Sequence, residues 1–174
     1  MSAQATPLRD GGRHSSLGSA KLWGVAFGLV QAATPLLFWW LDAATVYAVG
    51  TVAIASIYVG FAVADGRPRV IAVESGVALG FVILAAVAIT GPPWLLVAGL
   101  AGHGLKDLWQ HRTHFVANTR WWPPFCMTVD FVVAAIIVID QSYGGHLRIE
   151  PWPFVQSAAR PSTSRARACW PACG

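Results

Sequence analysis

The residues best suited to chemistry lie close together in one stretch of this 174-residue chain. The order His-x-x-x-Asp-x-x-x-His-x-x-His places His103, Asp107, His111 and His114 at intervals of three or four residues. Residues at this spacing share one face of an α-helix. An imidazole and a carboxylate four residues apart on a helix can bind one metal ion together, or they can exchange a proton. The stretch therefore predicts a metal site or an acid–base site.

Two further polar residues extend this helical face. With about 100° of rotation per residue, Lys106 and Gln110 fall within the same arc of about 140° as the histidines and Asp107. The opposite face carries the apolar residues Leu105, Leu108 and Trp109. A helix with one such polar stripe must turn that stripe toward protein or water if it lies in lipid.

The rest of the chain has the composition of a membrane protein. Hydrophobic residues make up 55% and charged residues 11% of the sequence, whereas about a quarter of the residues of soluble domains are charged. The apolar residues form long blocks, and a block of about 20 residues can cross a bilayer as a helix. The predicted fold is an all-α polytopic membrane protein, a bundle of five transmembrane helices at about 22–41, 43–64, 70–90, 94–112 and 122–139.

The charges between these blocks predict an orientation. Basic residues gather in the N-terminal segment and in every second loop, as they do on the cytoplasmic side of membrane proteins; they are Arg9, Arg13, Lys21, Arg67, Arg69, Lys106, Arg112 and Arg120. The N-terminus is therefore expected in the cytoplasm and the C-terminus outside it. Residues 1–20 form a polar cytoplasmic segment, residues 21–140 the transmembrane domain, and residues 141–174 an extracytoplasmic tail whose composition predicts disorder.

This topology brings three acidic residues to one depth. Glu74 lies near the start of the third predicted helix, Asp107 near the end of the fourth and Asp130 near the start of the fifth. Three carboxylates in a low dielectric cannot all stay ionised without protons, basic side chains or a metal ion. We therefore expect these three residues and His103 to form a polar site in the cytoplasmic half of the membrane.

The sequence leaves three interpretations of this site open, and with them the question of whether the protein is an enzyme. With a divalent ion such as Zn, Fe or Mn, for which mixed nitrogen and oxygen ligands are suitable, it is a metal-dependent membrane enzyme acting on a lipid or other hydrophobic substrate. As a charge relay, it serves a small proton- or ion-coupled transporter or channel-like oligomer. As a salt-bridge network, it stabilises a structural or accessory subunit, with Lys106 paired to Glu74 or Asp130 and Asp107 paired to Arg112.

Other residues predict contacts with lipid and between helices. Arg120, Trp121 and Trp122 fit either a lipid phosphate or an interfacial belt. Gln31, at the middle of the first predicted helix, could form a hydrogen bond with His103 at similar depth. Small residues four apart let helices approach closely. They predict a compact bundle and also allow a homo-oligomer through Gly and Ala faces; these pairs are Gly24 with Gly28, Gly76 with Gly80, and Ala98 with Gly102.

The expected partner of the chain is the lipid bilayer and not nucleic acid. The formal net charge is +4, but the basic residues flank the apolar blocks and form no stripe with interleaved aromatic residues, as a nucleic-acid interface would require.

Two runs of the sequence resemble a known group of proteins. The run HGLKDLWQH at 103–111 and the run TRWWPPFC at 119–126, followed by Asp130, resemble small uncharacterised multi-pass integral-membrane proteins of actinobacteria. The resemblance covers the last two predicted helices and their connecting loop. It implies a bacterial plasma membrane and carries no established activity.

Overall fold

The computed structural model describes residues 11–117 and 120–144, and within these ranges the chain forms helices and no strand. The elements are α1 (Gly11–Ala32), α2 (Thr34–Leu37), α3 (Ala43–Asp65), α4 (Pro68–Thr90), α5 (Trp94–Thr113) and α6 (Trp122–Ser142). The predicted all-α class is confirmed. The predicted disorder of the tail falls almost wholly on residues 145–174, which lie outside the described residues.

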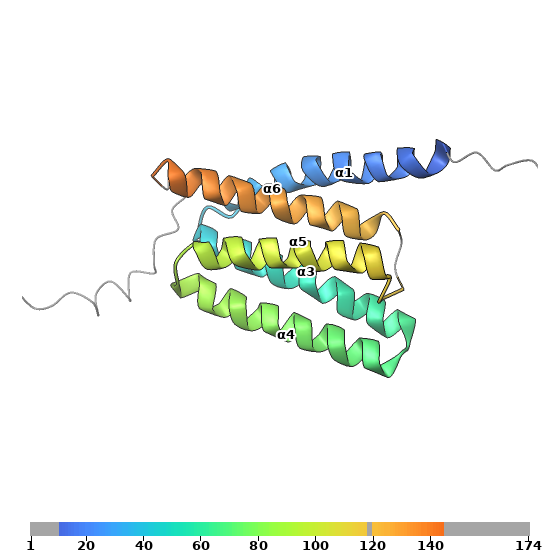
Figure 1. The fold of residues 1–174 in the computed structure, drawn as a ribbon. Helices are drawn as coiled ribbons and strands as arrows, with labels where there is room; N and C mark the ends of the chain where they lie inside the picture. Colours follow the sequence, from blue (N-terminus) through green and yellow to red (C-terminus); the bar gives the residue numbers. More distant parts are fainter. Residues whose placement is uncertain (1–10, 118–119, 145–174) are drawn as a thin grey trace, which may run out of the picture.

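The five long helices lie side by side and alternate in direction (Figure 1). α6 packs extensively against both α1 and α5, and α3 packs extensively against α4 as a hairpin. The backbones of α3 and α4 approach that of α5 less closely, although one apolar core joins these helices and α6. The bundle thus consists of a three-helix group, α1–α6–α5, and the α3–α4 hairpin, which meet mainly along α5. We call this boundary the seam.

Four segments are long and apolar enough to cross a membrane: Leu17–Leu37, which combines most of α1 with α2, and the helices α3, α4 and α6. α5 has 20 residues, a sufficient length, but it does not reach the hydropathy of the other four. Its C-terminal half holds the polar residues that the sequence placed on one face. Because α5 runs beside α3 and α6 along the length of the bundle (Figure 1), these polar residues are surrounded by apolar helices.

The first predicted span, 22–41, is not one continuous helix. α1 ends at Ala32, and the short α2 follows. Pro35 is the physical reason, because a proline has no N–H to donate and its ring clashes with the carbonyl four residues earlier, here that of Gln31. The Thr34 hydroxyl donates to this Gln31 carbonyl over 2.6 Å. The other four spans agree with the prediction, the largest difference being α6, which ends at Ser142 instead of 139.

Glycines decide how closely α1 approaches α6. A Cβ atom at Gly24 would lie 2.7 Å from the Thr128 Cβ, and one at Gly28 would lie 2.9 Å from the Val132 Cβ. Such distances exclude any larger residue, so this predicted pair packs within the chain. A Cβ at Gly76 or Gly80 of α4 would meet no atom within 4 Å. Association of two copies through the α4 pair stays a prediction.

The turn between α3 and α4 is tied to the loop that follows α5. The Asp65 carboxylate accepts hydrogen bonds from Arg67 (2.8 Å) and from the Ala117 N–H (2.9 Å), and Arg67 donates to the Phe115 carbonyl (2.6 Å). The bond to Asp65 raises the pKa of Arg67 above its ordinary value. α3 ends at Gly66, whose backbone has the left-handed conformation with φ 77°. Glycine is the usual residue at such a helix end. These contacts fix the seam at one end of the bundle.

Candidate metal centre

Three side chains that the sequence predicted as metal ligands come together at the middle of the bundle. α5 contributes His103 and Asp107, one turn apart, and α6 contributes Asp130. The His103 Nδ1 atom lies 2.8 Å from Asp130 Oδ2 and 3.5 Å from Asp107 Oδ2. One donor atom from each residue lies within 4.8 Å of the others, and none of the three side chains is more than 1% exposed. This geometry allows all three to bind one ion.

Gly104 brings the two helices close enough for this contact. A Cβ atom at this position would lie 3.2 Å from the Phe131 ring and 3.4 Å from the Cβ of Asp130. A larger residue would require the Phe131 ring to shift and would crowd Asp130. The position of Gly104 beside His103 on a helix is the sequence signal that could have indicated this close approach.

The opposite side of the His103 ring faces the α3–α4 hairpin. Its centroid lies 6.0 Å from that of Tyr58 in α3 and 5.1 Å from that of Phe81 in α4, with the rings steeply inclined to each other. His103 therefore sits in the seam, between carboxylates on one side and two aromatic rings on the other. Neither aromatic residue belongs to a motif, so only the fold reveals this contact.

The cluster contains more hydrogen-bond acceptors than donors. Four of its buried atoms have no hydrogen-bond partner among the described residues: His103 Nε2, Asp107 Oδ1 and Oδ2, and Asp130 Oδ1. Ionised carboxylates only accept, and a neutral imidazole has one N–H to donate. A buried polar atom without a partner is costly. The cluster therefore needs a cation or added protons.

A second buried polar group lies beside the first. The Lys106 Nζ atom is 2.8 Å from Glu74 Oε2, an ion pair whose angles are outside those of a hydrogen bond. The Gln110 amide donates to Glu74 Oε1 over 2.6 Å and accepts from the Val116 N–H over 3.2 Å. Lys106 also lies 3.5 Å from the centroid of the Tyr58 ring. Glu74, a predicted ligand, thus belongs to this group and not to the three-residue cluster.

The two groups differ in charge. Lys106 balances Glu74, as the salt-bridge interpretation expected for this pair. Asp107 and Asp130 carry two negative charges when ionised, and among the described residues His103 is the one basic neighbour within ion-pair distance. One divalent cation would neutralise them with a neutral imidazole, and so would two protons.

Polar residues at the C-terminal end of α5 lie away from the cluster. His111 is half-buried, whereas Arg112 and His114 are exposed, and the two imidazole centroids are 6.4 Å apart. The ion pair between Asp107 and Arg112 that one interpretation required is not formed, because Asp107 faces His103 instead. The histidines of the motif therefore divide into one buried residue and two at the end of the helix.

The remaining predicted residues contact other parts of the bundle. Gln31 in α1 lies beside Gly50 of α3, where its Nε2 atom would be 2.7 Å from a Cβ, and it forms no hydrogen bond with His103. Arg120 and Trp121 are exposed at the end of the bundle, and Trp122 is half-buried with its ring 5.8 Å from that of Phe61.

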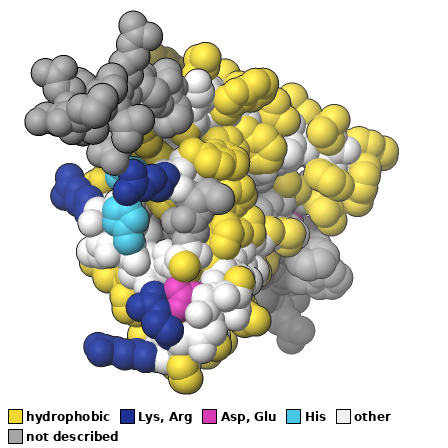
Figure 2. Space-filling view, turned by 90° about the vertical axis from the view of Figure 1, so that its right-hand side faces the viewer, with side chains coloured by type: hydrophobic (Ala, Val, Ile, Leu, Met, Phe, Trp, Pro, Cys, Tyr) yellow, Lys and Arg dark blue, Asp and Glu magenta, His cyan; other side chains and the backbone are white. Residues whose placement is uncertain are grey.

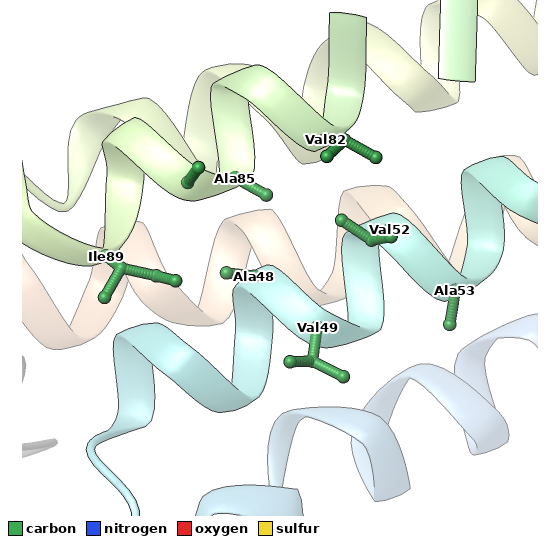
Figure 3. A pocket seen from close by; sticks show the side chains of 8 residues that line it. Ala48, Val49, Val52, Ala53, Val82, Ala85 and Ile89 are labelled. Carbon is green, nitrogen blue, oxygen red and sulfur yellow. The ribbon is translucent and has the colours of Figure 1, made fainter. Parts of the chain in front are cut away.

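An apolar groove of about 350 Å³ lies between α3 and α4 (Figure 3). The side chains that line it are all aliphatic: Ala48, Val49, Val52, Ala53, Val82, Ala85, Ala86 and Ile89. It offers hydrocarbon contacts and no group able to ligate an ion or move a proton. The chemistry of the described residues is therefore concentrated at the seam.

Comparison with known proteins places the chain in no family. The chain matches no protein-family model, no curated protein and no solved structure. The resemblance to actinobacterial membrane proteins thus stays a prediction, and the fold and the buried cluster are the grounds on which a function can be argued.

Proposed function

We propose that the chain is a metal-dependent enzyme of the bacterial plasma membrane that binds one divalent ion through His103, Asp107 and Asp130 and acts on a lipid or other hydrophobic substrate. The observation that carries the proposal is the excess of buried acceptors: four atoms of these residues have no hydrogen-bond partner among the described residues. A divalent ion can contact several of these atoms at once and neutralises both carboxylates.

The ligand set favours a first-row transition metal or zinc. One imidazole nitrogen and two carboxylate oxygens form a mixed shell that suits Zn, Fe or Mn. Structural zinc sites are closed by four protein ligands, whereas catalytic sites have three and leave a position open. Three donors in this cluster therefore favour a catalytic role. A bound ion would supply Lewis acidity at the open position.

The seam gives a hydrophobic substrate a route to the cluster. The His103 ring contacts Tyr58 and Phe81 of the hairpin, and the backbones of the hairpin helices approach that of α5 less closely than α6 does. A displacement of α3 and α4 from α5 would open the cluster to the bilayer. The cluster is closed to solvent in the present conformation, which protects the reacting groups from bulk water.

The same architecture ranks the enzyme above the transporter. The polar side chains of α5 run from His103 toward one end of the bundle, with Lys106 and Gln110 along the way. Toward the other end of α5, large aliphatic residues take their place: Leu95, Leu96, Val97 and Leu100. A transport path needs polar access from both faces. In our proposal the polar end of the bundle faces the cytoplasm, with the N-terminus inside.

Elemental analysis of the protein purified in nanodiscs tests the proposal. We expect about one equivalent of Zn, Fe or Mn per chain, because one ion neutralises the cluster. The variants His103→Ala, Asp107→Ala and Asp130→Ala should lose the metal, and the metal-loaded wild type should alter a membrane lipid extract that Asp107→Ala leaves unchanged.

Glu74→Gln is the matched control. It also neutralises a buried carboxylate, but it lies in the second group, beside Lys106 and Gln110, and should leave the metal content unchanged. A wild-type protein without stoichiometric metal would contradict the proposal, as would equal metal loss in Glu74→Gln and Asp107→Ala.

A further inference from the structure

Basic side chains from three parts of the chain meet at one end of the bundle. Lys21 of α1, Arg112 and His114 of the α5 end, and Arg120 before α6 all lie within electrostatic range of the His111 ring. Figure 2 looks onto this end and shows Lys and Arg side chains gathered around histidine. We call these five residues, three cations and two histidines, the cationic cluster.

The cationic cluster is not neutralised by carboxylates of the described chain. None of its five residues takes part in the ion pairs found among the described residues. Arg67, at the same end, is different, because Asp65 and the Phe115 carbonyl occupy its guanidinium. Like charges held together repel one another, so an anion bound among them lowers the free energy of the cluster.

The backbone has an unusual conformation at one residue of the cationic cluster. His114 has φ 51° and is the one non-glycine residue with positive φ among the described residues. This conformation is unfavourable for a residue with a Cβ. It ends α5 with a hydrogen bond from the His114 N–H to the Gln110 carbonyl (2.8 Å). It also keeps the His114 ring 6.4 Å from that of His111.

Exposed apolar side chains border the cationic cluster. Leu22 and Trp23 follow Lys21 in α1 and are 71% and 69% exposed, and Trp121 follows Arg120 and is 44% exposed. A soluble anion would need no such border. An amphipathic anion needs both parts, because its charged group binds the cations while its hydrocarbon covers the neighbouring apolar surface.

We propose that the cationic cluster binds the phosphate group of an anionic phospholipid, and that this lipid is the substrate class of the enzyme proposed above. Binding does not depend on the metal; the role as substrate rests on the proposed function. Guanidinium groups suit phosphate because they donate paired hydrogen bonds. His103 lies eight residues before His111, about 12 Å deeper along α5. The three proposed metal ligands would therefore lie at the depth of the acyl chains of a lipid whose phosphate is bound by the cationic cluster.

Lipid selectivity tests the inference. The protein is placed in phosphatidylcholine nanodiscs and titrated with phosphatidylglycerol carrying brominated acyl chains, which quench tryptophan fluorescence; brominated phosphatidylcholine is the reference. We expect the wild type to prefer phosphatidylglycerol about tenfold, because basic residues near the membrane surface attract anionic headgroups. The double variant Arg112→Gln/Arg120→Gln should reduce this preference to about twofold or less.

Two further variants separate a built site from general surface charge. Arg69→Gln removes an exposed cation outside the cluster and should leave the preference unchanged. His114→Gly removes the imidazole but suits the positive φ, so it should fold normally and weaken lipid binding. Equal preference for the two lipids in the wild type, or equal loss in Arg69→Gln and the double variant, would overturn the inference.

Free phosphate and metal analysis complete the experiment. Inorganic phosphate should fail to displace the brominated lipid; displacement at micromolar phosphate would make the ligand a soluble anion and overturn the lipid assignment. The metal content is measured on the same samples. Lipid selectivity without metal contradicts the proposed enzyme only, whereas metal without lipid selectivity contradicts this inference only.

Discussion

Two polar groups lie next to each other on α5, both buried and both containing carboxylates, yet they are built differently. In the first, His103, Asp107 and Asp130 supply many acceptors and one imidazole donor. In the second, Lys106 balances the charge of Glu74 in an ion pair, and Gln110 donates a hydrogen bond to the same carboxylate. Buried charge alone therefore does not indicate function. The balance of charge distinguishes a structural group from one that needs a ligand.

The two groups also connect different helices. The second group joins α5 to α4 across the seam, because Glu74 belongs to the hairpin. The first group joins α5 to α6 and touches the hairpin only through the rings around His103. The seam is thus held by a balanced ion pair at one point and by aromatic contacts at the other. We expect mutations in the two groups to have opposite effects on stability.

The largest effect is expected for Lys106→Met. This change leaves the Glu74 carboxylate buried without its cation, and breaking such a pair costs about 3–5 kcal/mol. Reversible unfolding in mixed detergent micelles would measure the loss. The double variant Lys106→Met/Glu74→Gln is the control and should recover most of the stability, because no unpaired charge remains. A single variant as stable as the wild type would show that this group is not the structural one.

The second effect is smaller and opposite in sign. Asp107→Asn in metal-free protein removes one of two carboxylates whose one ion-pair partner within the described part of the chain is His103. The variant should be as stable as the metal-free wild type or more stable, by about 1–3 kcal/mol, since a desolvated charge is lost. The same unfolding assay in the presence of a chelator measures it. Destabilisation comparable to that of Lys106→Met would mean that both groups are structural.

The sequence predicted the first group better than the second because its geometry is mostly local. His103 and Asp107 share a helical face because they are four residues apart. The depth of Asp130 followed from the order and length of the predicted spans. Both features survive small errors in helix boundaries. The all-α class and the apolar spans were predictable for the same reason, since hydropathy depends on composition along a short window.

The rest depends on contacts between helices, which periodicity does not report. Depth placed Glu74 in the same layer as Asp107, but the rotation of α4 turns its carboxylate toward Lys106 and Gln110. α4 has no second buried polar residue that would have indicated its inward face. Likewise, Gly104 admits α6 because of residues distant in sequence. The effect of proline on a helix predicts a break at Pro35. Hydropathy alone does not reveal this break, because the apolar composition continues through it.

The smallest effects concern Tyr58, which contacts both groups. Its ring lies under Lys106 at 3.5 Å and against His103. Its hydroxyl lies within interaction distance of the Asp107 carboxylate, but the contact does not have the geometry of a hydrogen bond. Tyr58→Phe should therefore change stability by less than about 1 kcal/mol, because no well-formed hydrogen bond is lost. Tyr58→Leu should cost about 1–2 kcal/mol more, the usual value of a buried cation–π contact.

Metal titration of the Tyr58→Phe variant then sharpens the comparison. If Tyr58 serves only the second group through its ring, the variant binds metal as tightly as the wild type. A weaker affinity would assign the hydroxyl to the first group, as a donor or a fourth ligand for the ion. If the hydroxyl is a fourth ligand, the cluster would be a closed site of four ligands and would fit a structural metal site better than a catalytic one.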